Sequence, residues 1–269
     1  MSVRGKSVII TGGARGVGRY VARTFAAEGA RVAVADLGPF ENVEHELDQA
    51  GAGEWMTVKT DVTNELQVRS LMDQVHKRFG RIDVLINDAG IVTHFHEGAP
   101  RWSRIRDMDL AFFQKVIMTN LGGTFLCTKH ALPYMESLNA GHVINFGQGS
   151  LNGSSGRNSN VGACVYGTSK ISIRAFTQGV ADEEREFNIC IVSMGPGTGS
   201  GPRLAAGPGV PGGGGGIVTD DSPEWSRQRT DGRGVDSVGN RYILAAEAPM
   251  EFSGRQVMVR DGQLAIADE

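Results

Sequence analysis

The chain has 269 residues, of which 40% are hydrophobic and 21% charged, and its formal net charge is −3 at pH 7. This length and composition suit one folded domain with a sizeable core. No basic tract is present, so nucleic acid is not an expected partner. No stretch approaches eighteen consecutive apolar residues, and residues 1–6 lead directly into the first predicted strand, so we expect neither a membrane span nor a signal peptide. The three dispersed cysteines, Cys127, Cys164 and Cys190, are typical of small apolar fillers in a reducing compartment, and we expect a cytoplasmic protein.

The amino-terminal region predicts a strand, a glycine turn and a helix. Residues 7–10 form a short apolar run, residues 11–18 read T-G-G-A-R-G-V-G, and residues 19–28 have a helical pattern. Glycines at this spacing allow the backbone to approach a pyrophosphate, whose charge is favourable at a helix N-terminus. The strand–turn–helix context therefore predicts a dinucleotide site.

The next strand, residues 31–36, ends in an acid about where a dinucleotide fold places a carboxylate for ribose hydroxyls. That acid, Asp36, would repel a 2′-phosphate, which favours NAD over NADP. Arg15 gives the opposite indication, because a basic side chain in the glycine turn could meet such a phosphate. We give Asp36 more weight because its charge would lie closer to the ribose.

Strand-like and helix-like segments alternate through the rest of the chain. This alternation is typical of an α/β fold, a doubly wound parallel sheet of about seven strands flanked by helices in a single domain over residues 1–269. The ligand of such a sheet lies at the carboxyl ends of its strands. We expect Pro133 to break the helical region 111–137. The further predicted strands are 55–58, 84–86, 142–145 and 189–193, and the further predicted helices are 64–79 and 112–118.

Tyr166 and Lys170 are four residues apart, so on a helix they share one face. A free tyrosine titrates near pH ~10, and a nearby cation favours the phenolate and lowers its pKa. A shift of two or three units corresponds to about 3–4 kcal/mol. The pair can therefore build a tyrosine able to exchange a proton with an alcohol or a ketone oxygen.

Taken together, these and several other motifs make the chain resemble the short-chain dehydrogenase/reductase family from end to end. Asp88 departs from the family pattern, because it replaces the second Asn of Asn-Asn-Ala-Gly. The matching segments are the glycine motif at 11–18, Asp61-Val62, residues 87–90, Asn120, the Tyr166/Lys170 pair, Pro196-Gly197 and the C-terminal segment 253–262.

The resemblance implies an NAD-dependent enzyme that interconverts a secondary alcohol and a ketone. Tyr166 would be the general acid/base, Lys170 would lower the pKa of its phenol and hold the nicotinamide ribose, and Asn120 would fix a water that relays protons. A homo-oligomer, a tetramer or a dimer, is also implied, packed through residues 111–137 and 167–187. The cofactor-binding residues expected from the motifs and the resemblance are Gly12, Arg15, Gly16, Val17, Gly18, Asp36, Leu37, Asp61, Val62, Asn87, Ala89, Gly90, Tyr166, Lys170, Pro196, Gly197 and Thr198.

The resemblance fails at two places near the expected active site. No serine stands where the family places its catalytic serine, and a Gly/Ser/Asn-rich insertion covers residues 147–162. We take Ser150 as the candidate, with Ser154, Ser155 and Gln148 as alternatives. After Pro196-Gly197 the usual threonine is replaced by Gly201, and we take Thr198 in its place.

Three further expectations concern the loops and the alternative functions. A Gly/Pro-rich stretch from Gly195 to Gly216 predicts a substrate lid within residues 195–225. His94 and His96 form an H-x-H with no evident third ligand, so we expect no metal site. Two alternatives to a dehydrogenase stay open: a dinucleotide-binding sensor or assembly protein with little redox activity, and a lyase or isomerase on the same scaffold. The sequence does not identify the substrate.

Overall fold

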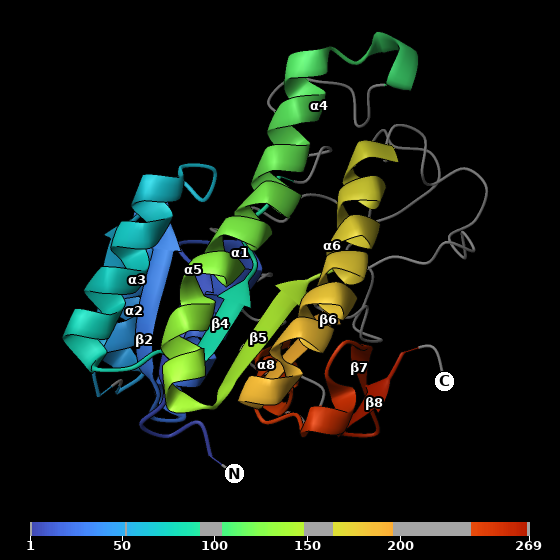
Figure 1. Cartoon of the computed structure of the whole chain (residues 1–269). Coiled ribbons are helices and arrows are strands. Elements are labelled where there is room, and N and C mark those ends of the chain that lie inside the picture. The colour runs from blue at the N-terminus through green and yellow to red at the C-terminus, as the bar shows by residue number, and fades with distance from the viewer. Residues whose placement is uncertain (1, 52, 92–103, 148–163, 196–237, 268–269) are drawn as a thin grey trace.

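The computed structural model describes residues 2–51, 53–91, 104–147, 164–195 and 238–267 (Figure 1). Its sheet has eight strands in the order β3-β2-β1-β4-β5-β6-β7-β8. The first seven strands pair in parallel, and β8 runs antiparallel to β7. The predicted doubly wound sheet is therefore confirmed. The strands are β1 (Ser7–Thr11), β2 (Arg31–Asp36), β3 (Trp55–Lys59), β4 (Val84–Asn87), β5 (Gly141–Phe146), β6 (Ile189–Met194), β7 (Gln256–Arg260) and β8 (Gln263–Ile266).

Helices cover both faces of the sheet. On one face Val8 and Ile10 of β1 pack with residues of α1, α2 and α8, and on the other Ile9 packs with residues of α3, α5 and α6. Burial from both sides explains why these strands are continuous apolar runs. The helices are α1 (Gly16–Ala27), α2 (Glu41–Gln49), α3 (Glu65–Phe79), α4 (Leu110–Ile117), α5 (Gly123–Leu138), α6 (Cys164–Glu183) and α8 (Val238–Ala245).

The predicted break at Pro133 is wrong. Helix α5 runs through Pro133 to Leu138, and the irregularity lies earlier, in a π-helical turn over Met118–Gly122 that joins α4 to α5. Proline removes one backbone hydrogen bond from a helix. Leu132 and Met135 beside it are buried, so packing against the sheet maintains the helix despite that loss.

The strand β8 was not predicted. It follows β7 through a two-residue turn in which Asp261 has φ 52° and Gly262 has φ 76°. Positive φ at both central residues is the backbone of a type I′ hairpin, for which Asp-Gly is a favoured sequence. The signal for this hairpin was therefore present in the sequence.

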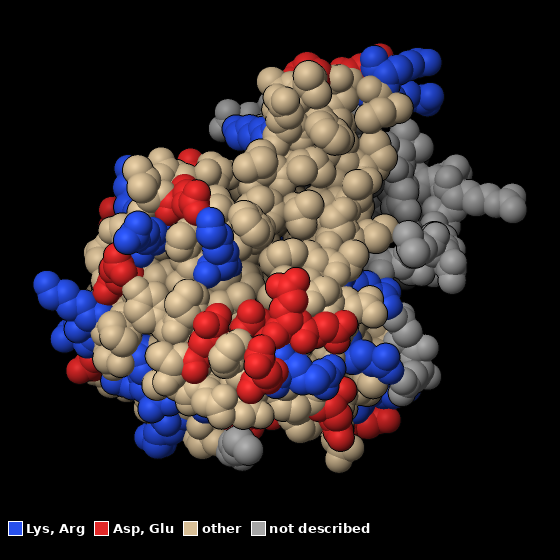
Figure 2. Space-filling view, viewed as in Figure 1, with Lys and Arg blue, Asp and Glu red and all other residues tan. Residues whose placement is uncertain are grey.

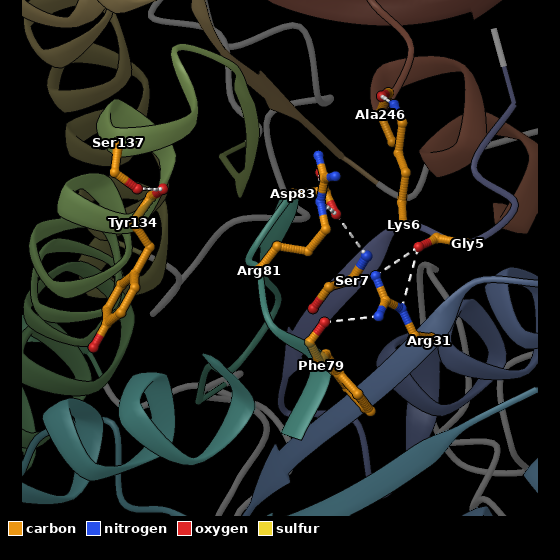
Figure 3. A network of polar contacts seen from close by, with 10 residues as sticks. All are labelled: Gly5, Lys6, Ser7, Arg31, Phe79, Arg81, Asp83, Tyr134, Ser137 and Ala246. Carbon is orange, nitrogen blue, oxygen red and sulfur yellow. Dashed lines mark hydrogen bonds and ion pairs between the residues drawn. The ribbon is translucent and has the colours of Figure 1, made fainter. Parts of the chain in front are cut away.

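Polar contacts fix the amino-terminal edge of the sheet (Figure 3). A carboxylate oxygen of Asp83, just before β4, accepts the buried N–H of Ser7 in β1 at 2.8 Å. The Arg31 guanidinium of β2 donates to the carbonyls of Phe79, at 2.7 Å, and Gly5, at 2.9 Å. These bonds tie β1 to the segment before β4, and β2 to the end of α3 and to the segment before β1.

One helical run in the described part of the chain, Leu110–Leu138, is long and apolar enough to cross a membrane, and 33% of its apolar 18-residue window is buried. Length and composition alone are weak evidence, because the core helix of a globular protein passes the same test. Within this run α5 packs against α3, β4 and β5, as a helix that covers a sheet does.

Candidate active site

The strand order reverses between β1 and β4, and in sheets of this kind the ligand crevice is expected at the carboxyl ends of the strands at this point. The glycine turn after β1 lies directly against the turn after β4. Gly12 has φ 71°, and a Cβ atom added there would lie 2.7 Å from the Cα of Ala89. A Cβ atom added at Gly18 would lie 2.9 Å from the Cα of Gly13. Only glycine allows this close backbone approach.

Helix α1 begins in this crevice. Its N-cap is the exposed Arg15, whose side chain makes no capping hydrogen bond, and its first turn contains no acidic residue. Gly16, half-buried Val17 and Gly18 make up that first turn. A helix N-terminus beside a glycine turn fits the pyrophosphate of a dinucleotide.

Asp36 closes the other side of the glycine turn. Its carboxylate accepts the backbone N–H of Ala14 at 3.0 Å and that of Leu37 at 2.6 Å. The Leu37 side chain is 61% exposed. A carboxylate held at the end of β2 beside the glycine turn fits the ribose hydroxyls of an adenosine. The residues present therefore fit the adenosine and the pyrophosphate of a dinucleotide.

Asp61 and Val62 follow β3 on the same edge of the sheet. One carboxylate oxygen of Asp61 accepts both the N–H and the hydroxyl of Thr63, at 2.9 and 2.7 Å. Val62 is buried, and its side chain packs closely on Gly123 at the start of α5. Local bonds thus fix the turn that holds Asp61 and Val62, both of which are expected cofactor-binding residues.

The side chain of Asn87 points into the core rather than into the crevice. Its amide donates to Asn145 of β5 at 2.8 Å and to Thr128 of α5 at 3.1 Å, and the Asn145 amide donates in turn to Thr177 of α6. This buried relay joins β4, β5 and two helices. It gives the Asn87 side chain a structural role and leaves only its backbone for the expected contact with a dinucleotide.

Asn120 lies fully buried in the π-helical turn. Its amide oxygen accepts the N–H of Ile91 at 2.7 Å, and its amide nitrogen donates to the Ser169 hydroxyl at 2.9 Å. Ser169 in turn donates to the carbonyl of Tyr166. Turns of this kind often occur at functional sites. Here the turn lets one side chain join the loop after β4 to the first turns of α6.

Lys170 and Tyr166 lie on α6, as predicted. The Lys170 ammonium is buried, donates to the Phe146 carbonyl at 2.9 Å, and lies 4.1 Å from the centre of the Phe146 ring and 5.6 Å from that of Tyr166. A Cβ atom added at Gly90 would lie 3.6 Å from the Lys170 nitrogen and 3.1 Å from the Asn120 amide oxygen. Residues far apart in the sequence therefore converge at the carboxyl edge of the sheet.

The expectation that Lys170 lowers the pKa of the Tyr166 phenol is wrong for this structure. Burial raises the pKa of Tyr166 above its usual value, and the negative charge of Asp88 raises it further. Burial also lowers the pKa of Lys170 to about 7, an effect that Asp88 opposes. Desolvation disfavours both the phenolate and the ammonium, so the phenol keeps its proton near neutral pH.

Several predicted residues lie outside the described part of the chain. Among the described residues no three His, Cys, Asp or Glu side chains gather closely enough to hold a metal ion. The predictions that fall outside are Ser150 and its alternatives Gln148, Ser154 and Ser155, the residues Pro196, Gly197 and Thr198, the histidines His94 and His96, the insertion 147–162 beyond Gly147, and the lid 195–225 beyond Gly195.

Sequence reasoning missed two contributors to the site. It gave no role to Ser169, although this residue follows Tyr166 by one helical turn. It also gave none to Tyr242, which is fully buried on α8 and close enough to Asp88 to lower the pKa of that carboxyl. No local pattern marks Tyr242, because only the packing of α8 brings it to the turn after β4.

Comparisons with known proteins agree with this geometry. The family model for short chain dehydrogenase matches residues 6–205. Secoisolariciresinol dehydrogenase of Forsythia intermedia is 32% identical over 195 residues, which are 72% of this chain and 66% of that protein. A short-chain type dehydrogenase/reductase from Mycobacterium marinum superposes with a TM-score of 0.65 at 32% identity, over 73% of this chain and 76% of that one. NAD+-bound xylitol dehydrogenase superposes with a TM-score of 0.64 at 28% identity, over 77% and 74% of the respective chains.

Proposed function

We propose that this chain, which belongs to the short-chain dehydrogenase family, is an NAD-dependent oxidoreductase that interconverts a secondary alcohol and a ketone. One observation carries the proposal: Tyr166, Lys170 and Asn120 converge beside the turn after β4, and that turn packs against the glycine turn. A protein that only bound a dinucleotide would not need all three side chains at this point.

In the proposed oxidation, the substrate hydroxyl gives its proton to the Tyr166 oxygen as the adjoining carbon loses a hydride, and a C=O bond forms. Reduction reverses both transfers, and Tyr166 then donates the proton. A bound nicotinamide supplies the carbon that accepts or gives the hydride. Asn120 and Ser169 hold the first turns of α6 against the loop after β4, which orients Tyr166. Lys170 lies where it could hold the nicotinamide ribose.

The raised pKa of Tyr166 determines whether this residue acts more readily as an acid or as a base near neutral pH. A phenol that keeps its proton can act as an acid but not as a base. We therefore propose that ketone reduction proceeds at neutral pH, whereas alcohol oxidation accelerates as the pH rises.

The preference for NAD rests on Asp36. Its carboxylate is fixed by two backbone N–H groups at the end of β2, where a 2′-phosphate would meet a like charge. One of the structural neighbours is an NAD+-bound xylitol dehydrogenase, which is consistent with this choice.

A spectrophotometric assay tests the proposed function. We expect consumption of NADH with a panel of ketones near pH 7, NAD reduction with the matching alcohols at higher pH, and a kcat/KM for NADH at least about tenfold above that for NADPH, equivalent to about 1.4 kcal/mol. Tight NAD binding without turnover on any carbonyl or alcohol would instead support the sensor or assembly alternative.

We also propose that the chain is a homo-oligomer, a dimer or a tetramer, packed through α4, α5 and α6. Figure 2 shows few charged side chains over α4 and α5, whereas charged residues gather on the lower half of this face. Exposed apolar side chains on α4 and α5 include Leu110, Phe113 and Phe125, and Phe125 also meets Phe176 of α6 edge to face. An apolar surface of this kind marks an association site.

Replacing Phe125 by Glu should shift the protein toward monomers in light scattering, because a charge would be buried at the interface. Met258→Glu provides the control, since Met258 is 39% exposed on β7 and belongs to none of α4, α5 and α6. An unchanged mass for Phe125→Glu, or a monomeric parent protein, would contradict the proposed interface.

A further inference from the structure

Phe146 is the last residue of β5, and the chain turns there. The N–H of the next residue, Gly147, donates to the carbonyl of Asn145 at 2.8 Å and to that of Met194 in β6 at 3.1 Å. A bond between residues two apart closes a γ-turn, and Phe146 is its central residue. Backbone bonds to two strands therefore fix Phe146 at the carboxyl edge of the sheet.

Helix α6 packs directly on this turn. A Cβ atom added at Gly147 would lie 2.9 Å from Cγ2 of the buried Ile173 and 3.3 Å from the carbonyl oxygen of Lys170. Because Gly147 has no side chain, the part of α6 that carries Lys170 approaches the end of β5 closely.

The Lys170 ammonium contacts two parts of Phe146 at once. It donates a hydrogen bond to the Phe146 carbonyl at 2.9 Å, and it lies 4.1 Å from the centre of the Phe146 ring. The face of an aromatic ring is negative and attracts a cation that lies within about 6 Å of its centre. The proposed function gives the Phe146 ring no role, although the ring lies well within this range.

Burial makes the ring face matter more to this cation. Lys170 is 2% exposed, so its ammonium has lost most of its contact with water. Burial lowers the pKa of Lys170 to about 7, an effect that Asp88 in the turn after β4 opposes. In the described part of the chain, the ionisable groups beside the ammonium are Asp88 and Tyr166, whose ring centre lies 5.6 Å away. A desolvated cation gains more from a ring face than an exposed one does.

We propose that Phe146 is a positioning residue for Lys170, whose charged ammonium it holds at the carboxyl end of β5 with its ring face and its carbonyl. The hold itself does not depend on the proposed function, whereas its effect on cofactor binding rests on that function. The carbonyl belongs to the backbone, so a substitution at this position keeps the carbonyl and removes only the ring. An aliphatic side chain of similar bulk would fill the space without offering a negative face.

Fluorinated phenylalanines at position 146 separate the charge of the ring face from the shape of the ring. Each added fluorine withdraws negative charge from the face and changes the size of the ring little. In protein labelled with 13C-lysine and free of cofactor, we expect the NMR titration midpoint of Lys170 to fall from the parent protein through difluoro- to trifluorophenylalanine. In Phe146→Leu it should fall by on the order of one unit, because the ammonium loses an attraction that the neutral amine does not have. The Lys170 resonance is assigned by its loss in Lys170→Met.

Phe252→Leu is the matched control. Phe252 is half-buried and packs on the same core cluster as Phe146, but it precedes β7 at the amino edge of the sheet. We expect the Lys170 midpoint of this variant, and that of Phe146→Tyr, which keeps a ring, to match the parent protein. Equal midpoints throughout the fluorinated series would overturn the proposal. A fall in Phe252→Leu as large as that in Phe146→Leu would also overturn it and assign the shift to looser packing.

Cofactor binding tests the part that rests on the proposed function. If the Lys170 ammonium holds the nicotinamide ribose, NAD binding weakens as the pH rises and Lys170 loses its charge. In Phe146→Leu this weakening should move to lower pH by on the order of one unit, as measured by calorimetric titration across pH. An unmoved profile together with a shifted Lys170 midpoint would leave the hold intact and contradict the role of Lys170 in cofactor binding. If the protein binds no NAD at all, the proposed function fails, and the NMR midpoints still decide whether Phe146 holds the ammonium.

Discussion

Tyr166→Phe should lower kcat by about 10²–10⁴-fold in both directions, the range that a general acid/base supplies, and leave the affinity for NAD within a few-fold of the parent protein. The phenol oxygen is the proposed site of proton transfer. The aromatic ring, which lies 5.6 Å from the Lys170 ammonium, stays in place in the variant. Stopped-flow or steady-state absorbance of the reduced nicotinamide measures kcat, and calorimetric titration with NAD measures the affinity.

Tyr134→Phe is the control for loss of a tyrosine hydroxyl. Tyr134 donates a hydrogen bond to Asp73 at 2.5 Å, on the exposed surface where α5 meets α3. We expect its removal to leave turnover unchanged. More than a tenth of parental kcat in Tyr166→Phe would show that another group moves the proton.

Much of the fold follows from patterns that depend on few residues at a time. The strand β1 is a short apolar run, as expected for a strand covered on both faces. Asp36 ends β2, as the predicted strand over residues 31–36 requires. The error at Pro133 arose because a local rule was applied to a helix whose buried neighbours stabilise it. The turn Asp261-Gly262 carries a hairpin signal, whereas the family resemblance by itself implies only that segment 253–262 ends the sheet.

The candidate site was less accessible from the sequence, because its chemistry depends on groups that meet only in the folded chain. Spacing placed Lys170 near Tyr166 correctly, and it suggested the wrong direction for the phenol pKa. The direction depends on how deeply both groups are buried and on the position of Asp88, which is 78 residues before Tyr166 along the chain. Helical periodicity does not report either quantity.

Gly18→Ala should weaken NAD binding by at least about tenfold and destabilise the fold by about 1–3 kcal/mol, the usual cost of an overpacked site. The added methyl group would meet backbone atoms of Gly12 and Gly13, two of them at 2.9 Å. Backbone atoms cannot rotate away as a side chain can, so the glycine turn would have to open. An open turn would displace the N-terminus of α1 from the proposed pyrophosphate.

The same substitution at Gly179 should have the opposite effect on stability. Gly179 lies on an exposed part of α6, and an added Cβ would meet nothing within 4 Å. Alanine there should stabilise the helix by about 0.5–1 kcal/mol and leave NAD binding unchanged. Denaturant unfolding and calorimetric titration of both variants separate the contribution of the glycine turn to the fold from its contribution to the site. If Gly18→Ala lost stability but bound NAD as tightly as Gly179→Ala, the turn would be structural and the dinucleotide would have to bind elsewhere.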